Sequence, residues 1–240
     1  MKRVLFVVAL VATAVVTVLI NAPAAWVGDW IEARSKLRLV DARGTVWRGS
    51  ALLGMSDGRA TTLVPGRVDW NLTLLPEPGL QVSHPWLTAP LRLTPSGKAL
   101  AFGAGSARLP AGVLASAGMP FNTLRPGGTL EARWSQGEVR AGTLTGELQI
   151  DWRDATSALS PVAPLGTYRI LVTGRGDTAT LDLQTLRGPL QMEGSGRING
   201  LQVRFRGTAT AEPSSRAALD GLLGVLGMRS GDKVLLAFDT

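Results

Sequence analysis

The spacing of hydrophobic residues changes once along the chain, and the change separates an apolar N-terminus from the rest. Lys2 and Arg3 precede residues 4–20, a run of seventeen residues without charge, proline or glycine. As a helix this run rises about 25 Å, and two further residues bring it close to the ~30 Å thickness of the hydrocarbon core. We therefore predict a cytoplasmic tip over residues 1–3 and a transmembrane anchor over residues 4–22.

A cleaved signal peptide is the alternative interpretation of this segment. Ala22-Pro23-Ala24 has the A-x-A form of a cleavage site behind a basic start and an apolar run. The run is longer than the roughly 7 to 15 residues usual for a signal peptide, and Trp26 and Trp30 follow it. We favour the uncleaved anchor. Both interpretations place the remaining chain in the periplasm, because positive residues before an apolar segment stay on the cytoplasmic side.

A short juxtamembrane helix is predicted over residues 25–36. Trp26, Val27, Trp30 and Ile31 fall on one side of this helix, which is the spacing of an amphipathic helix. Indole rings prefer the headgroup layer of a membrane. We expect the helix to lie against the bilayer surface, with Trp26 and Trp30 at the membrane interface on one side and Lys2 and Arg3 on the other.

From Leu37 onward apolar and polar residues alternate between glycine, proline and aspartate, a pattern typical of antiparallel strands. The fold class predicted is all-β dominated: a curved or half-closed antiparallel β meander with an N-terminal transmembrane helix and a short C-terminal helix. Residues 37–240 form one periplasmic β domain, with a possible subdivision near residues 155–165. The predicted strands cover residues 37–42, 45–53, 67–74, 80–84, 87–93, 99–109, 129–134, 138–141, 144–152, 168–173, 178–183, 190–198, 202–211 and 233–238, and helical turns cover residues 111–118 and 214–226.

The net charge and the distribution of basic residues indicate which kinds of partner the chain could bind. The formal net charge is +7, with 25 basic and 18 acidic residues among 240. The basic residues do not form a run of five or more, so the charge does not indicate nucleic-acid binding. A positive surface in the periplasm is better suited to anionic lipid headgroups or acidic proteins. The absence of cysteine is compatible with that oxidising compartment.

The chain is short of residues for catalysis or metal binding. His84 is the one histidine, there is no cysteine, and no G-x-S-x-G, P-loop or G-x-G-x-x-G motif occurs. A zinc-type site needs several nitrogen or sulfur ligands at suitable spacing. We predict a protein that is not an enzyme and that has no catalytic residues, no cofactor and no metal.

Two segments resemble the N component of the bacterial type II (general) secretion pathway. The first is Gly44-Thr45-Val46-Trp47-Arg48-Gly49, a G-T-x-W-x-G element that we place on the second strand. The second covers residues 183–227, where glycine-punctuated strands precede a leucine-rich helix. Its characteristic residues are Gly194, Gly196, Phe205, Gly207, Leu222, Leu223 and Gly227. Considered as residues alone, Gly44 permits a turn, Trp47 buries a large ring and Gly49 allows a bulge or a close approach.

The resemblance implies a bitopic inner-membrane protein that is accessory to the secretion machinery. Such a protein acts by contact with other type II secretion components during export of folded proteins from the periplasm. The resemblance supplies no catalytic residues. Exposed aromatic or aliphatic positions on edge strands are the expected contact surface, because unpaired strand edges recruit other strands.

The meander also resembles the periplasmic half-barrel proteins of the AsmA type, which handle lipids in envelope biogenesis. Under this alternative the curved sheet keeps an apolar groove open for acyl chains, instead of filling it with side chains. The sequence leaves both interpretations open.

Overall fold

The computed structural model describes residues 17–33, 37–56, 61–117, 121–140, 143–199 and 202–239. Residues 1–16, which hold Lys2, Arg3 and most of the predicted anchor, lie outside these ranges. In the part of the chain that is described, no helix is long and apolar enough to cross a membrane. The chain divides into two compact units, Met1–Pro85 and Trp86–Thr240, referred to below as unit 1 and unit 2.

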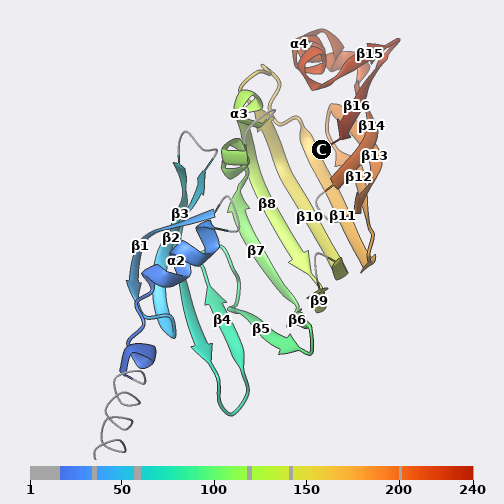
Figure 1. Ribbon diagram of the computed structural model, residues 1–240. Coiled ribbons are helices and arrows are strands. Elements are labelled where there is room, and N and C mark those ends of the chain that lie inside the picture. Colours follow the sequence, from blue (N-terminus) through green and yellow to red (C-terminus); the bar gives the residue numbers. More distant parts are fainter. Residues whose placement is uncertain are drawn as a thin grey trace, which may run out of the picture. The chain divides into compact units, whose positions relative to one another are not determined.

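The described residues of unit 1 contain the end of a helix at residues 17–20, a second helix and four antiparallel strands (Figure 1). Its strands pair in the order in which they occur along the chain. The small core is formed by Ala24, Ala51 and Trp70, with Leu39 and Leu80 among the residues packed against it. The elements are α2 (Ala25–Glu32), β1 (Leu37–Gly44), β2 (Arg48–Ser56), β3 (Thr61–Thr73) and β4 (Gly79–Ser83).

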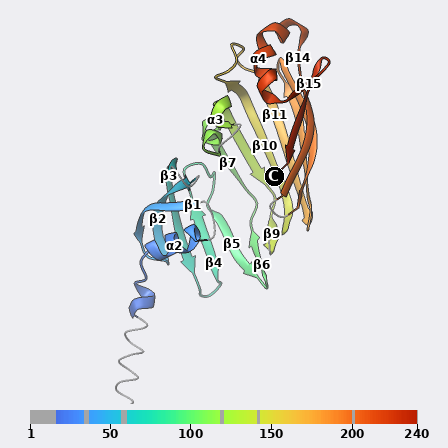
Figure 2. The same cartoon turned by 45° about the horizontal axis from the view of Figure 1, so that its top comes forward.

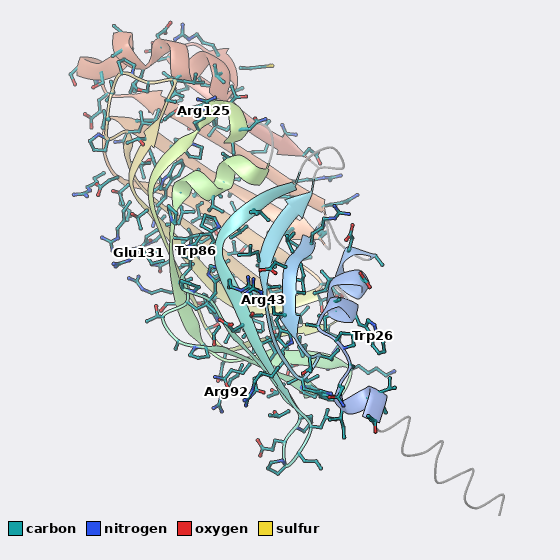
Figure 3. The ribbon with its side chains drawn as sticks, turned by 90° about the vertical axis from the view of Figure 1, so that its left-hand side faces the viewer. Trp26, Arg43, Trp86, Arg92, Arg125 and Glu131 are labelled. Carbon is teal, nitrogen blue, oxygen red and sulfur yellow. The ribbon has the colours of Figure 1, made fainter. Side chains whose placement is uncertain are left out.

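Helix α2 lies where the juxtamembrane helix was expected, and it packs on β1 of its own unit. A Cβ atom added to Gly28 would lie 3.4 Å from Leu39 Cβ, at ordinary van der Waals distance, so this part of the helix lies directly against the strand. Trp26 is exposed on the same helix (Figure 3). The described helix ends at Glu32, and residues 34–36 of the predicted helix lie outside the described ranges.

The first hairpin differs from the sequence prediction. The predicted turn at Arg43-Gly44 belongs to β1, and the chain reverses over residues 45–47 before β2 begins at Arg48. A register shift between Val40 and Arg43 adds length to β1 and displaces the turn. The G-T-x-W-x-G element is therefore the hairpin turn with its two flanks, and the second strand starts only at its fifth residue.

Unit 2 is an open antiparallel sheet with short helices at its margins (Figures 1 and 2). The strands follow the order β5-β6-β9-β10-β11-β12-β13-β14-β16-β15, and β8 joins β10 to β7. The elements are β5 (Leu91–Ser96), β6 (Ala99–Phe102), β7 (Gly105–Pro110), η1 (Ala111–Ala117), α3 (Phe121–Leu124), β8 (Pro126–Trp134), β9 (Gly137–Arg140), β10 (Thr143–Ser157), β11 (Gly166–Gly176), β12 (Ala179–Arg187), β13 (Leu190–Asn199), β14 (Gln202–Ala211), η2 (Pro213–Ser215), α4 (Arg216–Leu226), β15 (Met228–Ser230) and β16 (Lys233–Asp239).

The antiparallel all-β class and the C-terminal helix thus agree with the sequence prediction, while several boundaries do not. The predicted strand over residues 87–93 begins only at Leu91, and Leu87 instead forms an isolated bridge with Ala107. The predicted strand over residues 99–109 is split into β6 and β7. Between residues 155 and 165 the chain passes from β10 toward β11, and a subdivision there stays a prediction.

The core of unit 2 lies at one end of the sheet, under α4. Leu219, Leu222 and Leu223 of this helix are buried against Leu190, Ala209, Ala211 and Val234 of β13, β14 and β16. Further along the strands, apolar side chains alternate with charged ones: Ile150 and Tyr168 face one side, while Asp151 and Arg169 face the other. The sheet therefore has one apolar and one charged face.

Candidate functional site

The turn of the first hairpin holds the end of the N-terminal segment. The Trp47 indole Nε1–H donates to the Leu19 carbonyl oxygen at 2.8 Å. The Val46 amide donates to the Ala22 carbonyl at 2.9 Å, and the Ala24 amide donates to the Gly44 carbonyl at 3.1 Å. These bonds fix the segment that leads into α2 on the β sheet of unit 1.

Two glycines and a second tryptophan shape this turn. Gly44 has a φ of +86°, and a Cβ atom there would lie 2.5 Å from the Arg48 carbonyl oxygen. The Trp70 ring lies on Gly49, where a Cβ atom would come within 2.4 Å of it. Trp70 Nε1–H also donates to the Val46 carbonyl at 3.1 Å. The expected roles of Gly44 and Gly49 match this geometry.

The ring buried against the first hairpin is that of Trp70 on β3, which sequence reasoning missed. Trp47 is half-buried, with its N–H committed to Leu19, whereas Trp70 belongs to the core. The signal that could have found Trp70 is its place opposite Gly49 in the β2–β3 register, because a large ring often covers a cross-strand glycine.

The predicted cleavage site is part of the folded unit. Ala22 is 5% exposed and Ala24 is 1% exposed, and Pro23 forms a bridge with Thr45. Directly before them, Val18, Leu19 and Ile20 are exposed. The described side chains before residue 21 are thus exposed, and the alanines at 22 and 24 are buried where the hairpin turn binds the segment.

The second family-like segment is structural. A Cβ atom on Gly194 would lie 2.4 Å from the Phe205 ring, and one on Gly196 or Gly207 would lie 2.5 Å from the carbonyl oxygen opposite it. The three glycines thus permit close approach of β13 and β14. At the end of α4, a Cβ atom on Gly227 would lie 2.1 Å from the Leu235 carbonyl oxygen. Leu222 and Leu223 lie in the core.

A network of arginines and two carboxylates crosses the charged face of unit 2. Asp151 on β10 is 3% exposed and accepts two bonds from Arg169 on β11, at 2.7 and 3.0 Å. The Arg169 guanidinium holds the pKa of Asp151 below its usual value. Glu131 on β8, labelled in Figure 3, accepts bonds from Arg108 at 2.7 Å and Arg153 at 2.8 Å.

The network borders a hollow of about 800 Å³ on β10 to β14, which has both polar and apolar walls. Its walls mix acids, amides, hydroxyls and arginines, among them Gln149, Arg169, Asp182, Glu193 and Arg206. Arg169, which lines the hollow, is already paired with the buried Asp151 carboxylate. In the described ranges no three histidine, aspartate or glutamate side chains are grouped to hold a metal ion.

His84 is enclosed within unit 1. Burial lowers the pKa of His84, because a partly desolvated imidazole is harder to protonate. Its Nε2 atom faces Gly66, where a Cβ atom would come within 2.8 Å. The histidine therefore lies partly buried against Gly66, and the nearby Asp69 carboxylate only partly offsets the effect of burial on its pKa.

Comparison with known proteins adds one finding to this geometry. A family model described as "Type II secretion system (T2SS), protein N" matches residues 35–235. The chain belongs to this family. No curated protein and no solved structure matches the chain significantly.

The T2SS protein N match includes both segments singled out by their sequence, the hairpin turn and the strands leading to α4. It begins after α2, so the apolar segment and the predicted cleavage site precede the matched residues. Membership identifies the chain as a component of the type II secretion machinery.

Proposed function

We propose that this T2SS protein N is an accessory inner-membrane component of the type II secretion machinery. It is a single-pass protein with a cytoplasmic N-terminus and a periplasmic β domain, is not an enzyme, and acts by contact with other secretion components during export of folded proteins. The observation that carries this proposal is the family match over residues 35–235.

The packing of the N-terminal segment supports an uncleaved anchor. Cleavage after Ala24 would remove Ala22 and Ala24, both almost completely buried, together with all three hydrogen bonds from the hairpin turn. Loss of packed atoms from a core destabilises the remainder. A mature chain starting at Ala25 would leave an open space beside Trp70 and Ala51.

An apolar surface at the C-terminal edge of unit 2 supports contact with another protein. Met228 on β15 is 75% exposed and lies opposite Leu235 on β16, which is also exposed. Strand β15 pairs only with residues 233–235, so the outer edge of residues 236–239 has no strand partner among the described residues. Unpaired strand edges beside apolar side chains accept strands from other proteins.

The experiment is site-specific photo-crosslinking in cells that express the secretion machinery. A photoreactive residue replaces Met228, and in a control it replaces Leu186, an exposed leucine on the internal strand β12. We expect covalent adducts with other secretion components from position 228 and few from position 186. Equal capture from both positions would remove the support for this edge, and normal export from a deletion strain would contradict the accessory role.

Lipid handling is the second candidate, and the apolar face of unit 2 favours it. Leu148, Ile150, Ile170 and Leu183 alternate with charged residues on β10 to β12 and are only partly buried. The close-packed core lies at the α4 end of the sheet. Large apolar surfaces left partly exposed mark interaction sites. Mass spectrometry of the purified full chain decides this: stoichiometric phospholipid that is lost in Ile150→Asp would favour lipid handling.

A further inference from the structure

The turn between β3 and β4 exposes two leucines at its tip. Residues 74–78 read Leu-Leu-Pro-Glu-Pro, and Leu74 and Leu75 are 56% and 86% exposed. The Thr73 hydroxyl donates to the Gly79 carbonyl at 3.2 Å and closes the base of the turn, and two prolines restrict its backbone. The tip therefore presents leucine side chains in a preformed arrangement, where a polar turn would be the ordinary choice.

The tip lies at the same end of unit 1 as the exit of the N-terminal segment (Figures 1 and 2). Trp47 connects the two. Its carbonyl accepts the Leu72 amide at 2.6 Å, two residues before Leu74, and its indole N–H donates to the Leu19 carbonyl at 2.8 Å. The exposed leucines of the tip and the exposed residues 18–20 are thus held by the same tryptophan.

Residues 18–20 are the described end of an apolar run that begins at residue 4. If that run enters a bilayer, the neighbouring tip reaches the boundary of the same bilayer. Apolar side chains there gain by leaving water, and an indole with one polar atom suits the boundary itself. Glu77, the one charged residue of the tip, is exposed and flanked by the two prolines, which suits the wet headgroup layer.

We propose that the β3–β4 tip is a second membrane contact, in which Leu74 and Leu75 lie in the interfacial layer of the bilayer that the N-terminal segment enters. This inference rests on the proposed anchor. The tip and the anchor exit then hold unit 1 at two points, which fixes its tilt against the membrane. A single flexible attachment would leave that tilt free.

The test uses the natural absence of cysteine from the chain. Leu75→Cys and, as a control, Leu63→Cys are labelled with an environment-sensitive fluorophore in the full chain, reconstituted in vesicles of phosphatidylethanolamine and phosphatidylglycerol. Leu63 is also an exposed leucine, near the opposite end of β3. We expect quenching by spin-labelled lipid to be several-fold stronger at position 75 than at position 63.

A third variant examines the cause. Adding Leu74→Ser to the labelled Leu75→Cys chain is expected to reduce lipid quenching at least several-fold, because Leu74 is the leucine that remains at the tip once Leu75 carries the label. A label at position 75 that responds to iodide in the water and not to spin-labelled lipid would overturn the proposal. A label shielded in cells but not quenched by lipid in vesicles would overturn it in favour of a protein partner.

The anchor itself is checked separately, by carbonate extraction of membranes and by the intact mass of the extracted protein. A chain that leaves the membrane on extraction contradicts the proposed anchor. A chain that stays in the membrane while the label at position 75 remains in water contradicts only the second contact.

Discussion

Asp151 is the buried carboxylate at the centre of the ion pairs on the charged face of unit 2. Its carboxylate is almost fully buried in the middle of β10 and receives a two-pronged bond from Arg169 on the adjacent strand. Gln149 adds contacts at 3.2 and 3.3 Å, and Arg133 lies 3.6 Å away. These partners join β8, β10 and β11 through one side chain.

We predict that Asp151→Asn destabilises the protein by about 2 kcal/mol. Hydrogen bonds to charged groups contribute about 1.5 to 3 kcal/mol each, and two are lost or weakened here. The Arg169 side chain is about one-third exposed, so water recovers part of this energy for the guanidinium. The expected cost therefore stays below the sum of the two bonds.

The pH dependence of this cost has a definite sign. The folded pKa of Asp151 is lowered, chiefly by its bonds from Arg169, so the unfolded chain takes up the proton first as the pH falls. The stability that Asp151 contributes is complete above the unfolded pKa, near 3.9, and is lost as the pH falls through the folded pKa. The difference between the wild-type chain and Asp151→Asn should shrink below about pH 4.

Urea unfolding of the full chain in detergent, followed by tryptophan fluorescence, measures these differences. Asp182→Asn is the matched control, because Asp182 is exposed on the same face and makes no ion pair in the described part of the chain. The control is expected to change stability by less than about 0.5 kcal/mol. Equal effects of the two substitutions at pH 7 would refute the argument that the buried pair stabilises the sheet.

Four further predictions follow from single side chains. Gly49→Ala should lower the unfolding free energy by about 1 to 3 kcal/mol, because the added methyl overlaps the Trp70 ring, and a urea midpoint unchanged from wild type would contradict it. Gly221→Ala, with nothing within 4 Å of the new Cβ atom, should instead raise the unfolding free energy by about 0.5 to 1 kcal/mol through helix propensity, and a lowered urea midpoint would contradict this. Trp47→Phe removes the donor to Leu19 and should increase proteolysis between residues 20 and 25, which a protection assay on membrane vesicles detects. His84→Asn should make the unfolding free energy depend less on pH between pH 7 and 5. The pKa of His84 is lowered in the folded protein, so below about pH 6.5 the unfolded chain binds the proton first and the wild type loses stability. A pH dependence as steep as that of the wild type would exclude this histidine as its cause.

The fold class was predictable because alternation and turn residues are local signals. From Leu37 onward they indicate antiparallel strands, and the structure has them with shifted ends. The position of the first turn was not predictable, since the register shift after Val40 depends on pairing with β2. Leu219, Leu222 and Leu223 were recognisable as the packed side of a helix, because their spacing alone defines it.

The charged network shows what sequence cannot supply. Glu131, Asp151 and Arg169 look like ordinary solvent-facing positions of alternating strands, and no local pattern marks Asp151 as buried. The register places Arg169 and Arg133, from the two neighbouring strands, beside this carboxylate. Such residues become visible only when strand order and register are known.

The same geometry occurs twice in the chain and explains why glycine is required at two distant places. In unit 1, Gly49 lies opposite Trp70, whose N–H donates to the Val46 carbonyl. In unit 2, Gly105 lies opposite Trp134, whose N–H donates to the Gly103 carbonyl at 3.0 Å, and a Cβ atom on Gly105 would come within 2.5 Å of that ring.

Both glycines begin a Gly-Ser-Ala sequence, and in both strand pairs the partner strand ends near the tryptophan. The sequence pattern escapes notice because the glycine and its tryptophan are separated by different lengths of chain. In each case the tryptophan ring packs on the backbone of the glycine, and its indole N–H donates to a carbonyl nearby. These contacts hold the two strands together. The buried clusters of this sheet are small. Rings packed on glycine backbone therefore bury apolar surface and stabilise the strands in places where no larger core does so.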